Sequence, residues 1–117
     1  MGFNFEELDV YSKAIDFVNN IYTLTRKFPK DETFALTGQL RRAAVSIAAN
    51  ISEESARTKK DFSRFIDMSR GSAFECVTLL EISRKQYDVE QRKCGNLRNK
   101  LVEISKMLSG LKKSVSR

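Results

Sequence analysis

The feature that most constrains the fold is a helical apolar periodicity that runs through almost the whole chain. Among 117 residues there are five glycines and a single proline, Pro29. A proline disfavours the helical conformation of the residue before it, so Pro29 is expected to end the first helical stretch. Long uninterrupted helices are therefore predicted, rather than strands joined by tight turns.

Four segments carry the three-and-four spacing of one helix face. They predict helices at roughly 7–28, 36–55, 59–86 and 89–112. Short connections between such helices are typical of an up-down-up-down arrangement. The predicted fold is all-α, an antiparallel four-helix bundle formed as a single domain over residues 1–117.

Apolar stripes give the predicted core. The second helix has the stripe Leu36, Leu40, Ala43, Ala44, Ile47 and Ile51, and the third has Phe62, Phe65, Ile66, Ser69, Ala73, Cys76 and Leu80. In the fourth helix, Leu97 to Leu111 step by four and three, the seam of packed helices. Thr58 is expected to cap the third helix, with Asp61 in the capping-box position. The predicted stripe of the first helix is Leu8, Tyr11, Ile15, Val18, Tyr22 and Thr25.

Basic charge is concentrated in the second half of the sequence. The formal net charge is +6. Residues 1–58 hold seven basic and eight acidic side chains, and residues 59–117 hold fourteen and seven. An anionic partner, RNA or DNA, is one interpretation, and a solvated lysine and arginine face is the other. The candidate nucleic-acid-binding residues are Arg41, Arg57, Lys59, Lys60, Arg64, Arg84, Lys85, Arg92 and Lys93.

Polar side chains lie along one flank of the apolar second helix, in LTGQLRRAAVSIAANISEESAR (36–57). Arg42, Asn50 and Glu53 share this flank, and Glu75 lies on the third helix. We interpret these four residues as a structural polar network between helices. Ligand or partner contact and, least favoured, catalysis are the alternatives. Arg41 lies further from the flank, and we expect it to face outward.

Small and apolar residues away from the predicted stripes suggest a subunit interface. Exposed apolar side chains near a mid-helix glycine favour an oligomer, because they would otherwise contact water. The alternative is a monomer with ordinary surface hydrophobes. The candidate interface residues are Val45, Ala49, Gly71, Phe74 and Ile82.

Catalytic and metal chemistry has no sequence support. The chain has no histidine, which removes the usual general base and the commonest transition-metal ligand. Neither a phosphate-binding glycine motif nor a nucleophile elbow occurs. We expect no enzyme activity, cofactor, metal or small-molecule substrate. Cys76 and Cys94 are expected to be free thiols. Lacking a signal peptide and a membrane-length apolar run, the protein is expected to be cytoplasmic, without membrane contact.

Four motifs follow one another along the chain, at Phe5–Val10, Ile21–Glu32, Leu36–Glu54 and Asp61–Glu75. Their order and residues resemble a known bacterial family, the 23S rRNA-intervening sequence proteins, also called S23 ribosomal proteins. The similarity covers about residues 5–80. Ser52 replaces a family alanine and Glu54 a family glycine, so a tight turn at that glycine is not expected here.

The resemblance implies a four-helix bundle that assembles as a homopentamer. Related accessory proteins of diversity-generating retroelements bind nucleic acid. The expected function is therefore that of a non-enzymatic oligomeric bundle that binds RNA or DNA through a basic surface. The alternative is a structural or protein-interaction scaffold with no nucleic-acid role.

Overall fold

The computed structural model describes residues 3–54 and 58–115, and within these ranges it is entirely helical, without strands. This confirms the all-α prediction for the described part of the chain. The elements are η1 (Asn4–Glu7), α1 (Asp9–Thr25), η2 (Lys30–Glu32), α2 (Leu36–Glu54), α3 (Lys59–Tyr87) and α4 (Gln91–Val115), where η marks a 3-10 helix.

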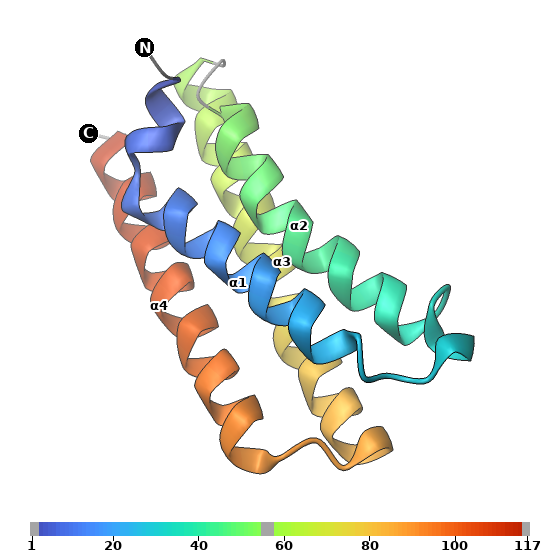
Figure 1. The fold of residues 1–117 in the computed structure, drawn as a ribbon. Helices are drawn as coiled ribbons and strands as arrows, with labels where there is room; N and C mark the ends of the chain where they lie inside the picture. The colour runs from blue at the N-terminus through green and yellow to red at the C-terminus, as the bar shows by residue number, and fades with distance from the viewer. Residues whose placement is uncertain (1–2, 55–57, 116–117) are drawn as a thin grey trace.

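The four helices are arranged as an elongated antiparallel bundle of 44 × 24 × 23 Å (Figure 1). Helix α1 packs against α2 and α4, and α3 packs against the same two helices. This four-helix arrangement matches the predicted bundle. One end contains the η2 loop and the α3–α4 connection, and the other contains η1 and the end of α4 (Figure 1).

The core face of α1 differs from the predicted stripe. Of that stripe only Thr25 is buried, and Ile15 is 39% exposed. Helix α1 has two apolar stripes one residue apart, about 100° around the helix. The predicted stripe contains two tyrosines, whose hydroxyls favour contact with water, whereas the other stripe is purely apolar. The buried stripe is Val10, Ala14, Phe17, Ile21 and Leu24.

The predicted core faces of the other helices are confirmed in their main residues. Helix α2 buries every residue of its apolar stripe, and the α4 seam is buried from Leu97 through Leu108. Helix α3 contributes Ile66, Ala73 and Cys76. Burying one such Leu or Ile side chain contributes about 1.5–3 kcal/mol, so this core accounts for most of the favourable folding energy.

Helix ends follow local chemistry. The Thr58 hydroxyl accepts a hydrogen bond of 3.3 Å from the Asp61 amide, which confirms the predicted cap. Helix α1 is shorter than the predicted 7–28, because Phe28 already closes a turn back to Thr25. Helix α3 ends at Tyr87 and is followed by Asp88, whose φ of 50° is left-handed, a conformation that aspartate tolerates better than most residues.

The glycine that the fold requires is Gly38, in the first turn of α2. A Cβ there would lie 2.5 Å from the Thr33 carbonyl oxygen, so only glycine lets the η2 loop pack this closely. Around Gly71, in contrast, a Cβ would meet nothing within 4 Å.

Candidate functional site

Charge is segregated along the long axis of the bundle. We call residues 22–42 and 81–98 the basic end, because these segments meet at the end of the bundle that contains the η2 loop. They hold ten basic and five acidic side chains, a net of +5, which leaves +1 for the rest of the sequence. The basic residues are Arg26, Lys27, Lys30, Arg41, Arg42, Arg84, Lys85, Arg92, Lys93 and Arg98, and the acidic ones Asp31, Glu32, Glu81, Asp88 and Glu90.

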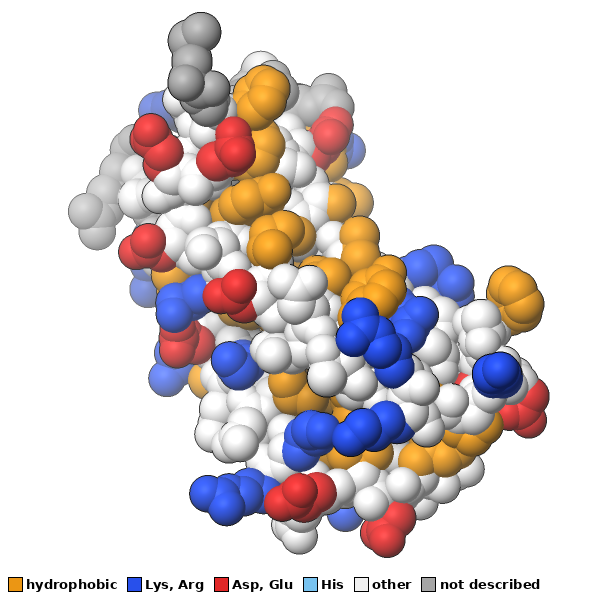
Figure 2. Space-filling model, in the orientation of Figure 1, with side chains coloured by type: hydrophobic (Ala, Val, Ile, Leu, Met, Phe, Trp, Pro, Cys, Tyr) orange, Lys and Arg blue, Asp and Glu red, His pale blue; other side chains and the backbone are white. Residues whose placement is uncertain are grey.

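The surface reflects this segregation. On the face drawn in Figure 2, large groups of lysine and arginine side chains cover the lower half of the molecule, where the basic end lies. Arg26, Lys27 and Lys30 are exposed and form no ion pair within the described part of the chain. Sequence reasoning missed these three because they belong to the net-acidic half of the chain. The up-down topology could have revealed them, since it places the end of α1 beside the start of α4.

The predicted nucleic-acid-binding residues do not form one surface. Arg84, Lys85, Arg92 and Lys93 lie at the basic end, whereas Lys59, Lys60 and Arg64 lie in the first turns of α3. Lys59 and Arg84 are 25 positions apart on one helix, about 37 Å. Arg64 also lies 3.8 Å from Asp61, and Arg57 lies outside the described residues.

Arg41 is directed toward α1 rather than outward, which corrects the expectation for this residue. Its Nε donates a hydrogen bond of 2.8 Å to Thr25 Oγ1, and its guanidinium carbon lies 4.5 Å from the centre of the Tyr22 ring. Thr25 in turn donates 2.8 Å to the Ile21 carbonyl. The guanidinium therefore joins α1 to α2, while its neighbour Arg42 is exposed.

The polar contacts between α2 and α3 involve serines rather than the predicted charged residues. Ser72 Oγ donates to Ser46 Oγ at 3.0 Å, and Asn50 Nδ2 donates to the same oxygen at 3.0 Å. Deeper in, Ser69 donates 3.0 Å to the Ile47 carbonyl. Of the predicted network, Asn50 joins these contacts through Ser46 on its own helix.

Two charged members of that predicted network, Arg42 and Glu75, take no part in these contacts within the described residues. Arg42 and Glu75 are exposed and form no ion pair within residues 3–54 and 58–115. Glu53 is exposed near the end of α2. The sequence pattern correctly predicted that this polar side of α2 faces α3. It could not identify the serine hydroxyl of Ser72 on α3 as the contacting group.

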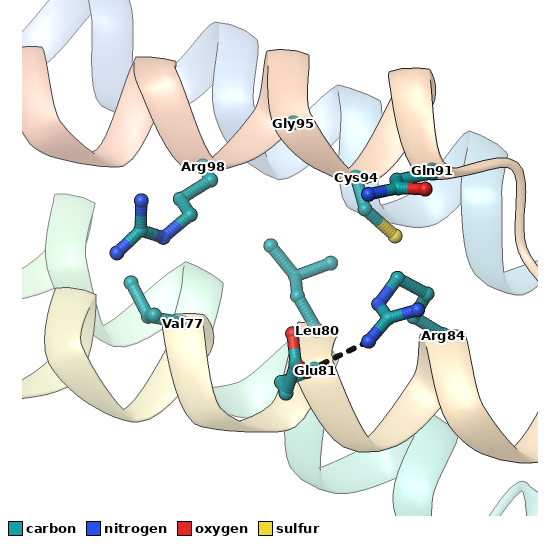
Figure 3. Close-up of a pocket in the computed structure, with 8 residues that line it drawn as sticks. All are labelled: Val77, Leu80, Glu81, Arg84, Gln91, Cys94, Gly95 and Arg98. Carbon is teal, nitrogen blue, oxygen red and sulfur yellow. Dashed lines mark hydrogen bonds and ion pairs between the residues drawn. The ribbon is translucent and has the colours of Figure 1, made fainter.

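A cleft between α3 and α4 lies at the basic end, with a volume of about 220 Å³; we call it the α3–α4 slot. Arg98 of α4 and Arg84 of α3 lie at its two ends, and Leu80 projects between them (Figure 3). Gly95 lies on the α4 wall, where a Cβ would meet nothing within 4 Å. The slot is lined by Val77, Leu80, Glu81, Arg84, Gln91, Cys94, Gly95 and Arg98.

Electrostatics inside the slot centre on one ion pair. Arg84 Nη2 donates to Glu81 Oε1 at 2.9 Å, and this hydrogen bond holds the pKa of the Glu81 carboxyl below its usual range. Burial raises the pKa of the Cys94 thiol, with the nearby Arg84 charge opposing this effect. Cys94 is therefore a neutral thiol near pH 7. Sequence reasoning selected Arg84 but missed Arg98, because no feature of the sequence shows that these two residues line the same cleft.

Two apolar grooves lie on opposite faces of the bundle. Tyr11, Ile15, Val18, Val45 and Ala49 line the one between α1 and α2, visible as an apolar stripe in Figure 2. The other lies between α3 and α4 and includes Phe74, 53% exposed, and Val102, 41% exposed.

The five predicted interface residues are therefore divided between faces. Val45 and Ala49 belong to the α1–α2 groove, and Phe74 belongs to the α3–α4 groove. Gly71 and Ile82 are exposed on α3 outside both grooves.

Neither a metal-ligand cluster nor a membrane-spanning helix occurs in the part of the chain that the structure describes. Within residues 3–54 and 58–115, no group of three or more Cys, Asp or Glu side chains is arranged to hold a metal ion. None of the helices in those ranges has both the length and the hydropathy to span a bilayer.

A comparison of the sequence with models of known protein families shows which family it belongs to. The model of the family described as 23S rRNA-intervening sequence protein matches residues 6–110. The chain belongs to this family. The match confirms the resemblance of the sequence motifs and extends it beyond residue 80 to residue 110, within α4.

The 23S rRNA-intervening sequence family fold is also found in a crystal structure. That protein, of unknown function, comes from the S23 ribosomal protein family of Bacteroides thetaiotaomicron. The two structures share a TM-score of 0.81 at 24% identity, covering 89% of this chain and 95% of the other. At this identity the likeness establishes the fold alone. No curated protein matches the chain.

Proposed function

We propose that this protein is a non-enzymatic, oligomeric helical bundle that binds RNA or DNA through its basic end. The observation that carries the proposal is the segregation of charge, with +5 of the formal +6 at one end of the bundle. A concentrated positive field attracts a polyanion and releases its condensed counterions on contact. The membership of a family named for 23S rRNA is consistent with such a partner.

Phosphate contacts require side chains that are exposed and not already paired. At the basic end Arg26, Lys27, Lys30, Lys85 and Arg92 meet both conditions within the described part of the chain. They come from α1, the η2 loop, α3 and α4, so together they cover the end of the bundle rather than one helix face. Such binding is strongly salt-dependent and weakly sequence-specific, because phosphates carry no base information.

Charge reversal at the two ends of the bundle tests this proposal. The variant Arg92→Glu/Lys93→Glu removes positive charge from the basic end, and Lys59→Glu/Lys60→Glu makes the same change at the opposite end. Both pairs lie in the first turn of a helix, where glutamate favours the helix dipole, so both variants should fold.

Mobility-shift titrations with a structured RNA and a DNA duplex measure the effect. We expect at least tenfold weaker binding for the basic-end variant and less than about twofold for the control, because a phosphate that no longer meets a cation keeps its condensed counterions. Equal weakening in both variants, or no binding by the wild-type protein at 50 mM salt, would contradict the proposal.

The two apolar grooves support the oligomeric part of the proposal. They lie on opposite faces, so the α1–α2 groove of one copy can accept the Phe74 face of the next copy. A head-to-tail contact of this kind closes into a ring when the rotation between neighbouring copies completes a full turn. We propose a closed pentamer with a formal charge of about +30.

Native mass spectrometry of the wild type and of Val45→Glu and Phe74→Ser tests this assembly. Either substitution alone should yield monomers, because each contact uses both faces. A wild-type monomer would contradict this part of the proposal.

A protein-interaction scaffold is the second candidate, and the same grooves favour it. An apolar groove that binds a different protein needs no basic end. An intact wild-type oligomer that fails to shift RNA or DNA at 50 mM salt would support the scaffold.

A further inference from the structure

We infer that the α3–α4 slot binds one unpaired nucleotide, with its nucleoside against the apolar middle of the slot and a phosphate at each end. This inference rests on the proposed nucleic-acid function and specifies its substrate class as nucleic acid with unpaired nucleotides.

The geometry of the slot carries the inference. Two guanidinium groups reach from different helices at its two ends, with the apolar Leu80 between them and Val77 beside Arg98 (Figure 3). The Glu81 carboxylate lies next to Leu80 and is paired with Arg84. Gly95 leaves the middle of the α4 wall open. Arg98 is exposed and forms no ion pair within the described ranges, so its donors are available.

A nucleotide inside a strand has the matching order of groups. Its sugar and base are flanked by one phosphate on each side, whereas a single inorganic anion leaves the apolar middle unused. Arginine presents five N–H donors in a planar fork that suits phosphate oxygens. Glu81 takes one donor from Arg84 and holds that side chain in place. The remaining donors of Arg84 are available to the second phosphate.

The size of the slot indicates whether the bound nucleotide is base-paired. A volume of about 220 Å³ between two helices is of the order of one nucleoside and smaller than a base pair. A base inside a duplex reaches such a site only by leaving the stack, which costs a few kcal/mol. The slot should therefore favour single strands, loops and bulges over a continuous duplex.

The first experiment uses a small probe, uridine 3′,5′-bisphosphate, titrated into the full chain and followed by the Gly95 amide in NMR spectra. Uridine and inorganic phosphate are the comparison ligands. We expect the bisphosphate to bind at least tenfold more tightly than either. Equal binding of inorganic phosphate, or no shift at Gly95 with the bisphosphate, would overturn the inference.

Two variants locate the effect in the slot. Gly95→Leu fills the middle without changing charge, and leucine is the better helix former, so the fold is retained. Arg98→Gln removes one guanidinium from an exposed, unpaired position. Each should weaken bisphosphate binding at least tenfold, while Arg92→Glu/Lys93→Glu should change it less than fivefold. Unchanged binding in Gly95→Leu overturns the site.

Polymer binding separates this inference from the proposed function. In mobility shifts, Gly95→Leu should weaken binding of single-stranded RNA and leave duplex binding unchanged, whereas Arg92→Glu/Lys93→Glu should weaken both. Wild-type binding of both polymers with no effect of Gly95→Leu overturns the slot alone. Bisphosphate binding without polymer binding overturns the proposed function and supports the slot as a nucleotide site.

Discussion

Arginine 41 should contribute to stability rather than to phosphate binding. The Arg41→Ala variant removes a charged hydrogen bond to Thr25 and the packing against the Tyr22 ring. A hydrogen bond from a charged donor contributes about 1.5–3 kcal/mol, and an exposed cation–π contact about 0.5–1. Because the guanidinium is only half-buried, we take the lower values. The free energy of unfolding should fall by about 2 kcal/mol, or about 8 °C in Tm.

Urea unfolding followed by far-UV circular dichroism, at one fixed protein concentration, measures this decrease. Arg42→Ala is the matched control: the same residue type, one position along, exposed and unpaired. It should change stability by less than about 0.5 kcal/mol. Arg41→Lys keeps the charge but not the fork geometry and should cost about 1 kcal/mol. Equal stabilities of Arg41→Ala and Arg42→Ala would refute the assignment.

Three further predictions concern packing, thiols and pH. Gly38→Ala should lower the free energy of unfolding by about 1–3 kcal/mol in urea, because the added Cβ lies 2.5 Å from a backbone carbonyl oxygen. An unchanged free energy of unfolding would show that the η2 loop moves to make room for it. In native protein at pH 8, mass spectrometry after alkylation should find Cys94 modified before Cys76, whose pKa burial raises to about 12; the reverse order would contradict this packing. The Lys13–Glu103 pair (2.6 Å) lowers the pKa of Glu103, so its stabilisation is present above about pH 4.5 and lost as pH falls through the folded pKa. Glu103→Gln should therefore reduce the difference in unfolding free energy between pH 6 and pH 3, and an unchanged difference would contradict the pairing.

The core could be predicted where only one arrangement buries the apolar groups. The seam of α4 and the stripe of α2 are each the main apolar face of their helix, so periodicity identified them. Helix α1 has two such stripes, and spacing could not distinguish the buried residues around Phe17 from the groove residues around Ile15. The presence of tyrosines on one stripe was the available signal.

The candidate site was harder to predict because charge was counted along the chain rather than in space. Arg26 and Lys30 belong to the net-acidic half, yet the bundle places them at the same end as Arg92. Lys59 belongs to the basic half but lies at the opposite end of α3. The direction of the Arg41 side chain could not be predicted from the apolar spacing either. It points toward Tyr22 because α1 packs against α2.

The salt dependence of RNA binding tests the central claim most directly. Each phosphate contact to a single strand contributes about 0.7 to the slope of log K against log salt. Removing the Arg92 contact in Arg92→Glu/Lys93→Glu should make the slope shallower by about 0.7, by the same relation. The variant Lys59→Glu/Lys60→Glu should leave the slope at the wild-type value. Equal slopes in all three proteins, or a change only in the Lys59/Lys60 variant, would contradict binding through the basic end.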